Sequence, residues 1–495
     1  MALFDRLSNA ISVFPGILMK IRLFLTAMFL AVVSSSAVAA NRPNVIFFLS
    51  DDHRADFLSC AGHPIVKTPV IDSLAEKGVR FENAFVTTSI CAASRATLFT
   101  GLWERSHKYT FGTPDIAAPM IDASYPAVLK RAGYRTGFVG KFGVSAGPGG
   151  TAKMFDSFVP LNRNKYWKKQ PDGSLRHLTD ITGDKSIEFI ESCSANKPFC
   201  LSVSFNAPHA EDNDKADHFP WPETENGLYE DVTIPPPLVS TDFWKTLPEF
   251  FHKSMHRGRF FWRWDTEEKY QKNVKAYYRM LTGLDRNMGR VLKALGEKGL
   301  AENTIVIFMG DNGYYKGSRG FAGKWSHFEE SLRVPLVIYD PRLPENRRGQ
   351  VLQQMALNVD VPATILGNAL GQAHETYQGR DLSPLIDDFA VGPWRTDFFC
   401  EHLMDNAGIP KYEGVRGERY VYARYFQNLP EGEFLHDLKE DPLQLKNLAT
   451  SAKHAAILKQ MRSRCDELRD SLGGEYSLEN IPTLKYLREK EKPKP

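Results

Sequence analysis

The sequence predicts an α/β fold with a large, mainly parallel central sheet flanked by helices, and a smaller α+β subdomain toward the C-terminal end. Three features support this prediction: four continuous apolar runs of strand length, helical patterns between them, and a change to alternating strand patterns after residue 388. Unbroken apolar runs are typical of parallel strands that are covered on both faces. Strands that alternate with helices favour such a sheet.

The expected elements of the main domain follow one another along the chain. The four strands are expected at residues 44–50 ("NVIFFLS"), 134–140, 199–205 and 304–309. Helices are expected at residues 68–78, 125–133 and about 269–300. Pro69 lies in the first turn of one helix, and Gly78 and Gly133 end two of them, which are the usual helical positions for these residues.

Two regions differ from the rest of the chain in composition and in hydrophobic pattern. Residues 210–263 are rich in proline ("FPWP", "IPPP") and acidic residues, which predicts an insertion over the sheet that lines a substrate cleft. In residues 389–485, "RGERYVYARYF" and "EFLHDL" read as strands joined by a turn near Pro430, followed by a helix at about 451–472. We therefore assign residues 40–388 to the main domain and 389–485 to the subdomain, and expect the charged tail 486–495 to be disordered.

The first 39 residues have the features of a secretory signal peptide. Lys20 and Arg22 precede an apolar run at 23–33, and small residues at 37–39 form a cleavage pattern. We expect a mature start near residue 40, with Met19 as an alternative initiation site. The apolar run is too short for a membrane span, and no later segment has eighteen consecutive apolar residues. The sequence thus predicts an exported protein, periplasmic or secreted, without a membrane span.

Composition excludes some classes of function. The 62 basic and 59 acidic residues leave a net charge of only +3, so no charge excess indicates nucleic acid or an anionic membrane as a partner. Six cysteines in 495 residues are too few for a disulfide-built scaffold. Cys193 and Cys200 are close enough in sequence to pair in an oxidising compartment, although buried free thiols are equally consistent with the pattern.

Carboxylates and amides follow two of the predicted strands. Asp51 and Asp52 come directly after the first strand, and Asp311 and Asn312 follow the strand at 304–309. In parallel sheets, ligands bind beyond the carboxyl ends of the strands. Hard oxygen ligands suit Ca²⁺ or Mg²⁺, and a cation would relieve the repulsion between adjacent carboxylates. The alternative is that these residues only cap turns and helices.

Cys91 lies where a helix is expected to begin, in "SICAASRATLFTG". The free N–H groups and the dipole of a helix start favour an anion there. Arg95, four residues on, lies on the same helical face and is able to hold a group built on Cys91. A buried structural cysteine with Arg95 in a surface salt bridge is the competing interpretation.

"CAASRATLFTG" resembles the sulfatase signature Cys-x-Pro/Ala-x-Arg. Around it, further segments stand in the order found in type I sulfatases: "NVIFFLSDDHR", "YRTGFVGKFG", "FNAPH", "MGDNGYY" and "GKWSHFEESLRVPLVIYDP". The resemblance covers nearly the whole mature chain, and it implies an alkaline phosphatase-like fold.

The resemblance also implies a chemistry. In this family a formylglycine-generating or sulfatase-maturing enzyme oxidises the signature cysteine, here Cys91, to formylglycine, whose hydrate attacks the sulfur of a sulfate ester. The family pattern makes Asp51, Asp52, Asp311 and Asn312 ligands of one Ca²⁺ per chain, with the modified Cys91 beside them.

The resemblance also implies roles for the remaining site residues. Arg95 is expected to orient the hydrate, and Lys141 and Lys324 to neutralise the sulfate oxygens. His209 is expected to assist the leaving alcohol as general acid. The usual "GKWHLG" reads "GKFGVS" here, so Gly143 stands where the family has a histidine that takes a proton during sulfate release. Three histidines are candidates to replace it, although a plain hydrogen-bonding or surface role is the more common one for each: His53, His107 and His327.

The C-terminal region resembles that of sulfatases acting on sulfated glycans, including glucosamine 6-sulfatases, so the expected substrate is a sulfated saccharide. Four residues are candidates for binding it: His327, Glu401, His402 and Arg416. The alternative is that they tie the small domain to the large one. Likewise, Trp221, Trp262 and Trp264 either stack on sugar faces or pack in the interior.

Two other functions compete with a sulfuric ester hydrolase. One is a phosphate or phosphonate ester hydrolase of the same superfamily, and the other is a non-catalytic glycan-binding descendant. Cys91 within the signature favours the sulfatase, because phosphatase relatives generally carry Ser or Thr there. The presence of both lysines and all four metal ligands disfavours a non-catalytic protein.

Overall fold

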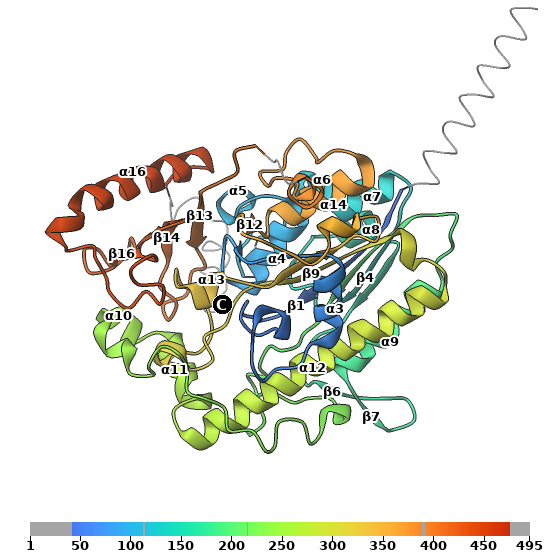
Figure 1. Ribbon diagram of the computed structural model, residues 1–495, viewed down its shortest axis with the longest axis horizontal. Helices are drawn as coiled ribbons and strands as arrows, with labels where there is room; N and C mark the ends of the chain where they lie inside the picture. Colours follow the sequence, from blue (N-terminus) through green and yellow to red (C-terminus); the bar gives the residue numbers. More distant parts are fainter. Residues whose placement is uncertain (1–41, 112–113, 215, 389–391, 476–495) are drawn as a thin grey trace, which may run out of the picture. The chain divides into compact units, whose positions relative to one another are not determined.

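The computed structural model describes residues 42–111, 114–214, 216–388 and 392–475 (Figure 1). The predicted signal peptide and the predicted disordered tail lie outside these residues. The described chain from Asn44 onward belongs to one compact unit. None of its helices combines the length and the apolar character that crossing a bilayer requires.

The four predicted strands form the centre of an eight-stranded sheet of order β11-β2-β10-β9-β1-β8-β4-β5. They are β1 (Asn44–Ser50), β4 (Arg135–Gly140), β8 (Phe199–Ser204) and β9 (Thr304–Gly310), and they run parallel. The sequence analysis missed the flanking strands β2 (Val79–Phe81), β5 (Ser157–Pro160), β10 (Leu336–Tyr339) and β11 (Gln350–Leu352), which have three or four residues each. β10 runs antiparallel to β9 and β2. The α/β prediction with a mainly parallel sheet is confirmed.

Strand β1 shows why its apolar run is unbroken. All seven of its residues are buried, and alternate side chains belong to two separate cores. Val45, Phe47 and Leu49 pack in one core, whereas Ile46 and Phe48 pack in the other. Each such burial contributes roughly 1.5–3 kcal/mol. Because both faces of the sheet are covered, no polar face remains to produce an alternating pattern.

Helices cover both faces of the sheet (Figure 1). One group packs on the core of Ile46: α3 (Pro69–Lys77), α9 (Leu178–Glu191) and α12 (Glu267–Glu297). The other packs on the core of Val45: α4 (Cys91–Thr100), α7 (Tyr125–Arg131) and α14 (Asp360–Leu370). Gly78 follows the last residue of α3. A side chain does not fit at this position, because a Cβ would lie 2.3 Å from the carbonyl oxygen of Ile338. The long helix begins two residues before its predicted start, after the N-cap Thr266.

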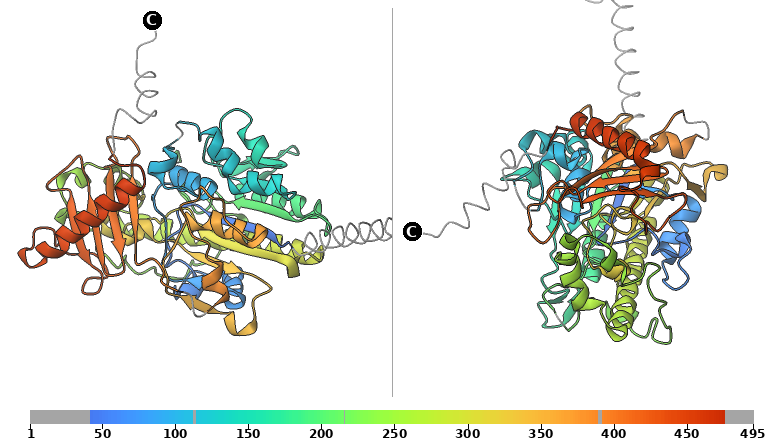
Figure 2. Two further views of the ribbon diagram at one scale, coloured as in Figure 1. Left: turned by 90° about the horizontal axis from the view of Figure 1, so that it is seen from above. Right: turned by 90° about the vertical axis from the view of Figure 1, so that its left-hand side faces the viewer.

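The C-terminal region forms a four-stranded antiparallel sheet of β13 (Asp397–His402), β14 (Tyr412–Gly417), β15 (Tyr420–Arg424) and β16 (Glu433–Asp437). Helix α16 (Ala455–Ser471) lies across it (Figure 2). The predicted strand "RGERYVYARYF" is in fact divided, because Gly417 ends β14 and the chain turns back into β15. Arg416 therefore belongs to a different strand from Tyr420.

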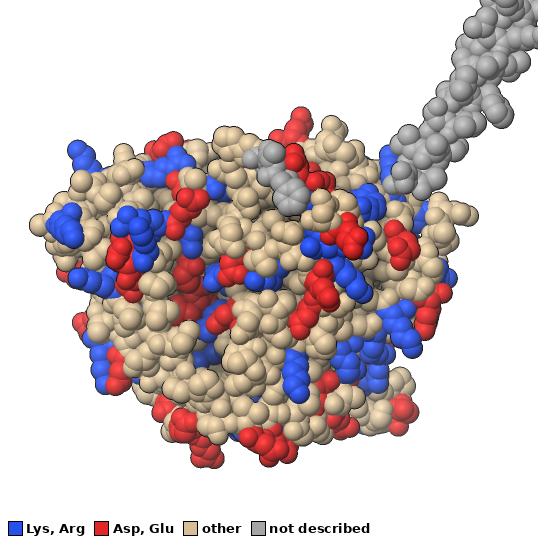
Figure 3. All heavy atoms as spheres, viewed as in Figure 1, with Lys and Arg blue, Asp and Glu red and all other residues tan. Residues whose placement is uncertain are grey.

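The predicted loop-rich insertion at 210–263 also contains helices. α10 (Glu249–His252) and α11 (Met255–Arg263) follow its proline-rich part. On the face drawn in Figure 3, basic and acidic side chains are interspersed, in keeping with the small net charge. Cys193 and Cys200 are both buried free thiols, so the structure does not join them in a disulfide.

Candidate active site

The carboxyl ends of β1 and β9 bring four predicted metal ligands together. The two strands are parallel neighbours, and Ser50 pairs with Gly310 at their ends. The backbone N–H of Asp52 donates to Asp311 Oδ1 at 3.2 Å, and Asn312 Nδ2 donates to Asp52 Oδ1 at 2.7 Å. Adjacent strands in register therefore place residues some 260 positions apart in sequence side by side.

The electrostatics of these residues fit a bound cation. Asp51 Oδ1 and Asn312 Oδ1 are buried, and no other atom of the described chain forms a hydrogen bond with them. Burial and the neighbouring Asp51 carboxylate raise the pKa of Asp311 to about 7. A buried oxygen without a partner and two buried carboxylates that repel each other are both costly. A divalent cation that prefers oxygen ligands removes both costs, and the donor set is of that kind.

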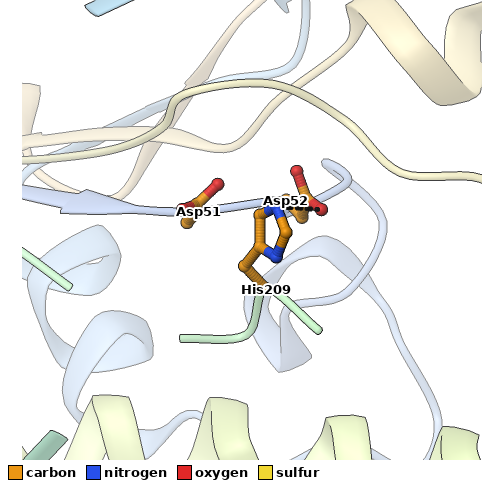
Figure 4. A group of neighbouring side chains, drawn as sticks. All are labelled: Asp51, Asp52 and His209. Atoms are coloured by element: carbon orange, nitrogen blue, oxygen red, sulfur yellow. Dashed lines mark ion pairs between the residues drawn. The ribbon is translucent and has the colours of Figure 1, made fainter. Parts of the chain in front are cut away.

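His209 joins the same cluster. It lies in the loop after β8, and its ring lies beside the Asp52 carboxylate (Figure 4), with Nε2 3.6 Å from Asp52 Oδ2. Potential ligand atoms of Asp51, Asp52 and His209 lie within 4.8 Å of one another. Nδ1 lies 2.8 Å from the Ala210 carbonyl oxygen and donates to it, which leaves Nε2 to accept from Arg163 at 3.3 Å. Burial, followed by the charge of Arg163, lowers the pKa of His209 well below its usual value.

Helix α4 begins at Cys91, after Ile90 in an extended conformation. Arg95 is 1% exposed, so it forms no surface salt bridge. Its Nε donates to Asp311 Oδ2 at 2.9 Å, and its NH1 group donates to the Lys141 carbonyl oxygen at 2.6 Å and to Ser204 Oγ. Arg95 therefore connects the helix that carries Cys91 to the ends of β4, β8 and β9.

Two lysines complete the centre. Lys141 follows β4 and forms an ion pair with Asp51, and Lys324 forms one with Asp52. Burial lowers the pKa of Lys324, but the negative groups around it, Asp52 foremost, together outweigh burial and raise that pKa above the usual value. Both lysines, Cys91 and His209 line one cavity of about 680 Å³, a size suited to a small ligand.

Gly143 also lines this cavity, and its surroundings bear on the missing family histidine. Its φ is +71°, and a Cβ there would lie 2.7 Å from Arg95 Cδ. The backbone conformation and Arg95 therefore leave no room for a histidine at position 143. Within the described residues, His209 is the one histidine among the lining residues.

The three candidate replacements lie elsewhere and are buried. His53 Nδ1 lies 3.0 Å from Ser50 Oγ, and His107 Nε2 lies 3.2 Å from Thr97 Oγ1. The ring of His327 contacts Tyr425 and His436. None of them lines the cavity. Their contacts agree with the hydrogen-bonding alternative.

The four candidate substrate-binding residues are not brought to the cavity either. Glu401 accepts from Arg105 of α5 (Glu104–His107), and Arg416 donates to Glu329 of α13 (Glu329–Leu332). His402 is fully buried, and His327 packs as described above. Buried charges need a partner of opposite sign. The structure therefore gives Glu401 and Arg416 the alternative role, which is to tie the C-terminal sheet to the main body.

The tryptophans highlighted in the sequence do not line the cavity, whereas Trp325 does. Trp264 is 2% exposed and packs on Phe219, and Trp262 is 40% exposed. Arg163, Asp212 and Arg259 also line the cavity and were missed. Arg163 follows the short strand β5, which the sequence analysis did not find, whereas Asp212 and Arg259 do come from the insertion predicted to line a cleft.

Comparisons with known proteins bear on the chemistry of this cavity. The family model described as "Sulfatase" matches residues 43–371, and the model described as "N-sulphoglucosamine sulphohydrolase, C-terminal" matches residues 317–471. The chain is 26% identical over 494 residues to an N-acetylglucosamine-6-O-sulfatase of Bacteroides thetaiotaomicron, with 86% of each covered.

Two solved structures share the fold. One is a protein in complex with its substrate D-glucosamine-2-N,6-O-disulfate, at a TM-score of 0.75 and 23% identity, covering 87% of this chain and 98% of that one. The other is the phosphonate monoester hydrolase of Agrobacterium radiobacter, at a TM-score of 0.72 and 23% identity, covering 87% and 96%.

Proposed function

The chain belongs to the sulfatase family, and from this premise we propose that it removes sulfate from a sulfated saccharide with a formylglycine made from Cys91 and a bound Ca²⁺. The general activity, hydrolysis of sulfate esters, follows from the family. The observation that carries the finer proposal is one cavity in which Cys91, at the start of a helix, meets Lys141 and Lys324. The ion-pair partners of these lysines, Asp51 and Asp52, belong to the cluster whose buried oxygens lack partners in the described chain.

Asp51, Asp52, Asp311 and Asn312 would hold the cation, which when bound supplies positive charge to polarise a sulfate oxygen and to activate the nucleophile. Formylglycine supplies a hydrated aldehyde as that nucleophile.

The other residues of the site serve positioning, binding and proton transfer in this proposal. Arg95, fixed by Asp311 and a backbone carbonyl, holds the group at position 91 in one orientation. Lys141 and Lys324 carry the charge that binds the sulfate oxygens. His209 is proposed to give a proton to the leaving alcohol. That step requires Nε2 to be protonated first, because Nδ1 is bound to Ala210.

The substrate class rests on the relatives. A similar enzyme is an N-acetylglucosamine-6-O-sulfatase, and a structural neighbour binds a glucosamine disulfate. A phosphonate monoester hydrolase shares the fold to a similar degree, so a phosphonate or phosphate ester is the second candidate.

We further propose that residues 1–39 direct export to the periplasm or the exterior, and that residues 40–388 and 389–485 are the catalytic domain and its subdomain.

The test is made on protein produced with a sulfatase-maturing enzyme. Peptide mass analysis is expected to find formylglycine at position 91, and sulfated saccharides are expected to be hydrolysed faster than a phosphonate monoester. The variant Cys91→Ala is expected to lose this activity. Unmodified Cys91 in fully active protein, or full activity in Cys91→Ala, would contradict the mechanism, and faster phosphonate hydrolysis would favour the second candidate.

A further inference from the structure

A second group of charged side chains lines the cavity that holds Cys91. Arg163 follows β5, Asp212 lies in the loop after β8, and Arg259 lies on α11. Arg163 NH2 lies 3.2 Å from Asp212 Oδ2, and Arg259 NH2 lies 3.7 Å from the same oxygen. Asp212 Oδ1 accepts from Arg263, which is fully buried. Three arginines therefore share one carboxylate.

The charges of this group do not balance. Arg263 occupies one carboxylate oxygen, so Arg163 and Arg259, here called the arginine pair, share the other. Lys141 and Lys324 are already paired with Asp51 and Asp52. In the described residues, Asp212 is the one acidic side chain among those that line the cavity. The wall near Asp212 therefore carries more positive than negative charge.

The arginine pair also has unused hydrogen-bond donors. The Nε atoms of both side chains are buried and have no hydrogen-bond partner in the described part of the chain. The side chains themselves are 22% and 17% exposed, so they remain accessible from the cavity. A buried guanidinium donor without an acceptor is costly. An anion in the cavity would meet the exposed part of each side chain and would offset the positive charge that Asp212 alone does not balance.

The arginine pair is also held close to the reaction centre. Arg163 NH2 lies 3.3 Å from His209 Nε2. The Arg259 guanidinium lies over the ring of Trp325, 5.0 Å from its centroid, and Trp325 directly follows Lys324. Each arginine thus contacts a residue of the centre or the neighbour of one. An anion bound by the pair would therefore lie in the same cavity as a group held at Cys91.

We propose that Arg163 and Arg259 form a subsite for a second anionic group of the substrate, a sulfate or a carboxylate carried by the same saccharide. The inference rests on the proposed function for the identity of the reacting group. Two guanidinium groups match the oxygens of a sulfate or carboxylate by paired N–H donors. The cavity, at about 680 Å³, is large enough for a saccharide that carries both groups.

The experiment compares Arg163→Gln, Arg259→Gln and the double variant on three substrates: a monosulfated hexosamine, the same sugar with a second sulfate, and a monosulfated hexosamine linked to a uronate. Losing charged hydrogen bonds is expected to lower kcat/KM for a doubly anionic substrate about 10- to 100-fold in the double variant. Activity on the monosulfated sugar is expected to change less than about threefold in Arg259→Gln. Because Arg163 contacts His209, the effect of Arg163→Gln and of the double variant is measured as the ratio of kcat/KM on the doubly anionic substrate to kcat/KM on the monosulfated sugar, and this ratio is expected to fall. The substrate that loses more, disulfate or uronate, identifies the second anion.

Controls separate the subsite from folding and from charge alone. Lys245→Gln removes a positive charge from a side chain that is 59% exposed and lies outside the cavity. It is expected to leave kcat/KM unchanged on all three substrates. Arg163→Lys and Arg259→Lys keep the charge but not the planar fork, so they are expected to retain an intermediate preference. An equal loss on all three substrates, or no loss on any, overturns the subsite.

Binding separates this inference from the proposed function. Calorimetry on Cys91→Ala with the monosulfated and disulfated sugars is expected to show tighter binding of the disulfate, and the double variant is expected to lose that preference. If the preference is found but no sulfate ester is hydrolysed by the matured enzyme, the proposed function fails and the subsite stands. If hydrolysis occurs without any preference, the subsite fails alone.

Discussion

At the scale of single residues, the position of the Arg95 side chain requires that residue 143 has no side chain. Arg95 spans the centre by contacts to Asp311, Ser204 and the backbone at Lys141. Its aliphatic part lies in the volume that a side chain at position 143 would need. In this chain, the backbone conformation of Gly143 and the position of the Arg95 side chain together exclude a side chain at position 143.

We predict that Gly143→His lowers activity instead of improving it. A non-glycine residue at φ +71° costs about 1–3 kcal/mol, and the new side chain displaces Arg95. The expected result is a loss of kcat/KM of tenfold or more, on the order of 1.4 kcal/mol in the transition state, together with a lower Tm. Gly143→Ala, which adds only the Cβ, should show most of the same loss. A faster Gly143→His enzyme would contradict this account.

At the scale of elements, the site is produced by strand order. β1 lies between β8 and β9, and β4 lies beyond β8, so four strand ends deliver their following residues to one place. The C-terminal sheet contributes Met404, Asn406 and Ile409 to the cavity wall. Its charged residues Glu401 and Arg416 serve instead to hold β13 and β14 against the main body.

Removal of the metal should lower stability through the ends of β1 and β9. Thermal unfolding is expected to shift to a higher Tm on addition of Ca²⁺ and to return on chelation. At a hundredfold excess over Kd, the expected gain in the free energy of unfolding is about 2.7 kcal/mol. Asn312→Ala removes one of the proposed ligand oxygens, which is buried without a partner in the described chain, and should raise the Kd for Ca²⁺ at least tenfold.

The matched control for that experiment is Asp122→Asn, which removes a carboxylate that is 48% exposed and distant in sequence from both strand ends. It should leave the Ca²⁺ dependence unchanged. If Asn312→Ala and the parent protein respond equally to Ca²⁺, the cation binds elsewhere.

At the scale of the whole molecule, many histidines are buried without charge. Burial lowers the pKa of His53 to about 4 and the pKa values of His107, His256 and His402 to about 3. In the unfolded chain these groups titrate near 6.5. Below that pH the unfolded state binds protons that the folded state does not, so stability is complete above about pH 6.5 and is lost as the pH falls toward 3–4.

We predict that the free energy of unfolding falls between pH 7 and pH 5, by up to about 1.4 kcal/mol per pH unit for each such histidine. Denaturant unfolding at several pH values measures this slope. His402→Leu removes two buried ring nitrogens that have no hydrogen-bond partner in the described chain. The slope should then become shallower, because up to one proton fewer is taken up on unfolding. An unchanged slope in His402→Leu would show that His402 titrates normally in the folded state.

The sequence alone determined the α/β class, the four central strands and the residues that meet at their ends. These features are local: long apolar runs mark doubly covered strands, and polar residues directly after parallel strands must share one edge of the sheet. The start of α4 at Cys91 also followed from the local pattern. The short flanking strands were missed because three or four residues carry too little periodicity to mark a strand.

Only the tertiary structure decided which other residues reach the cavity. Arg163, Asp212 and Arg259 come from separate segments and meet through packing, which no spacing in the sequence reveals. Glu401, His402, Arg416 and His327 carry polar groups that suggested substrate binding, but the folded chain buries them in other contacts. A side chain's chemistry is set by its residue type, whereas its partner is set by long-range packing, and that packing fixed both the arginine pair and the space denied to a side chain at Gly143.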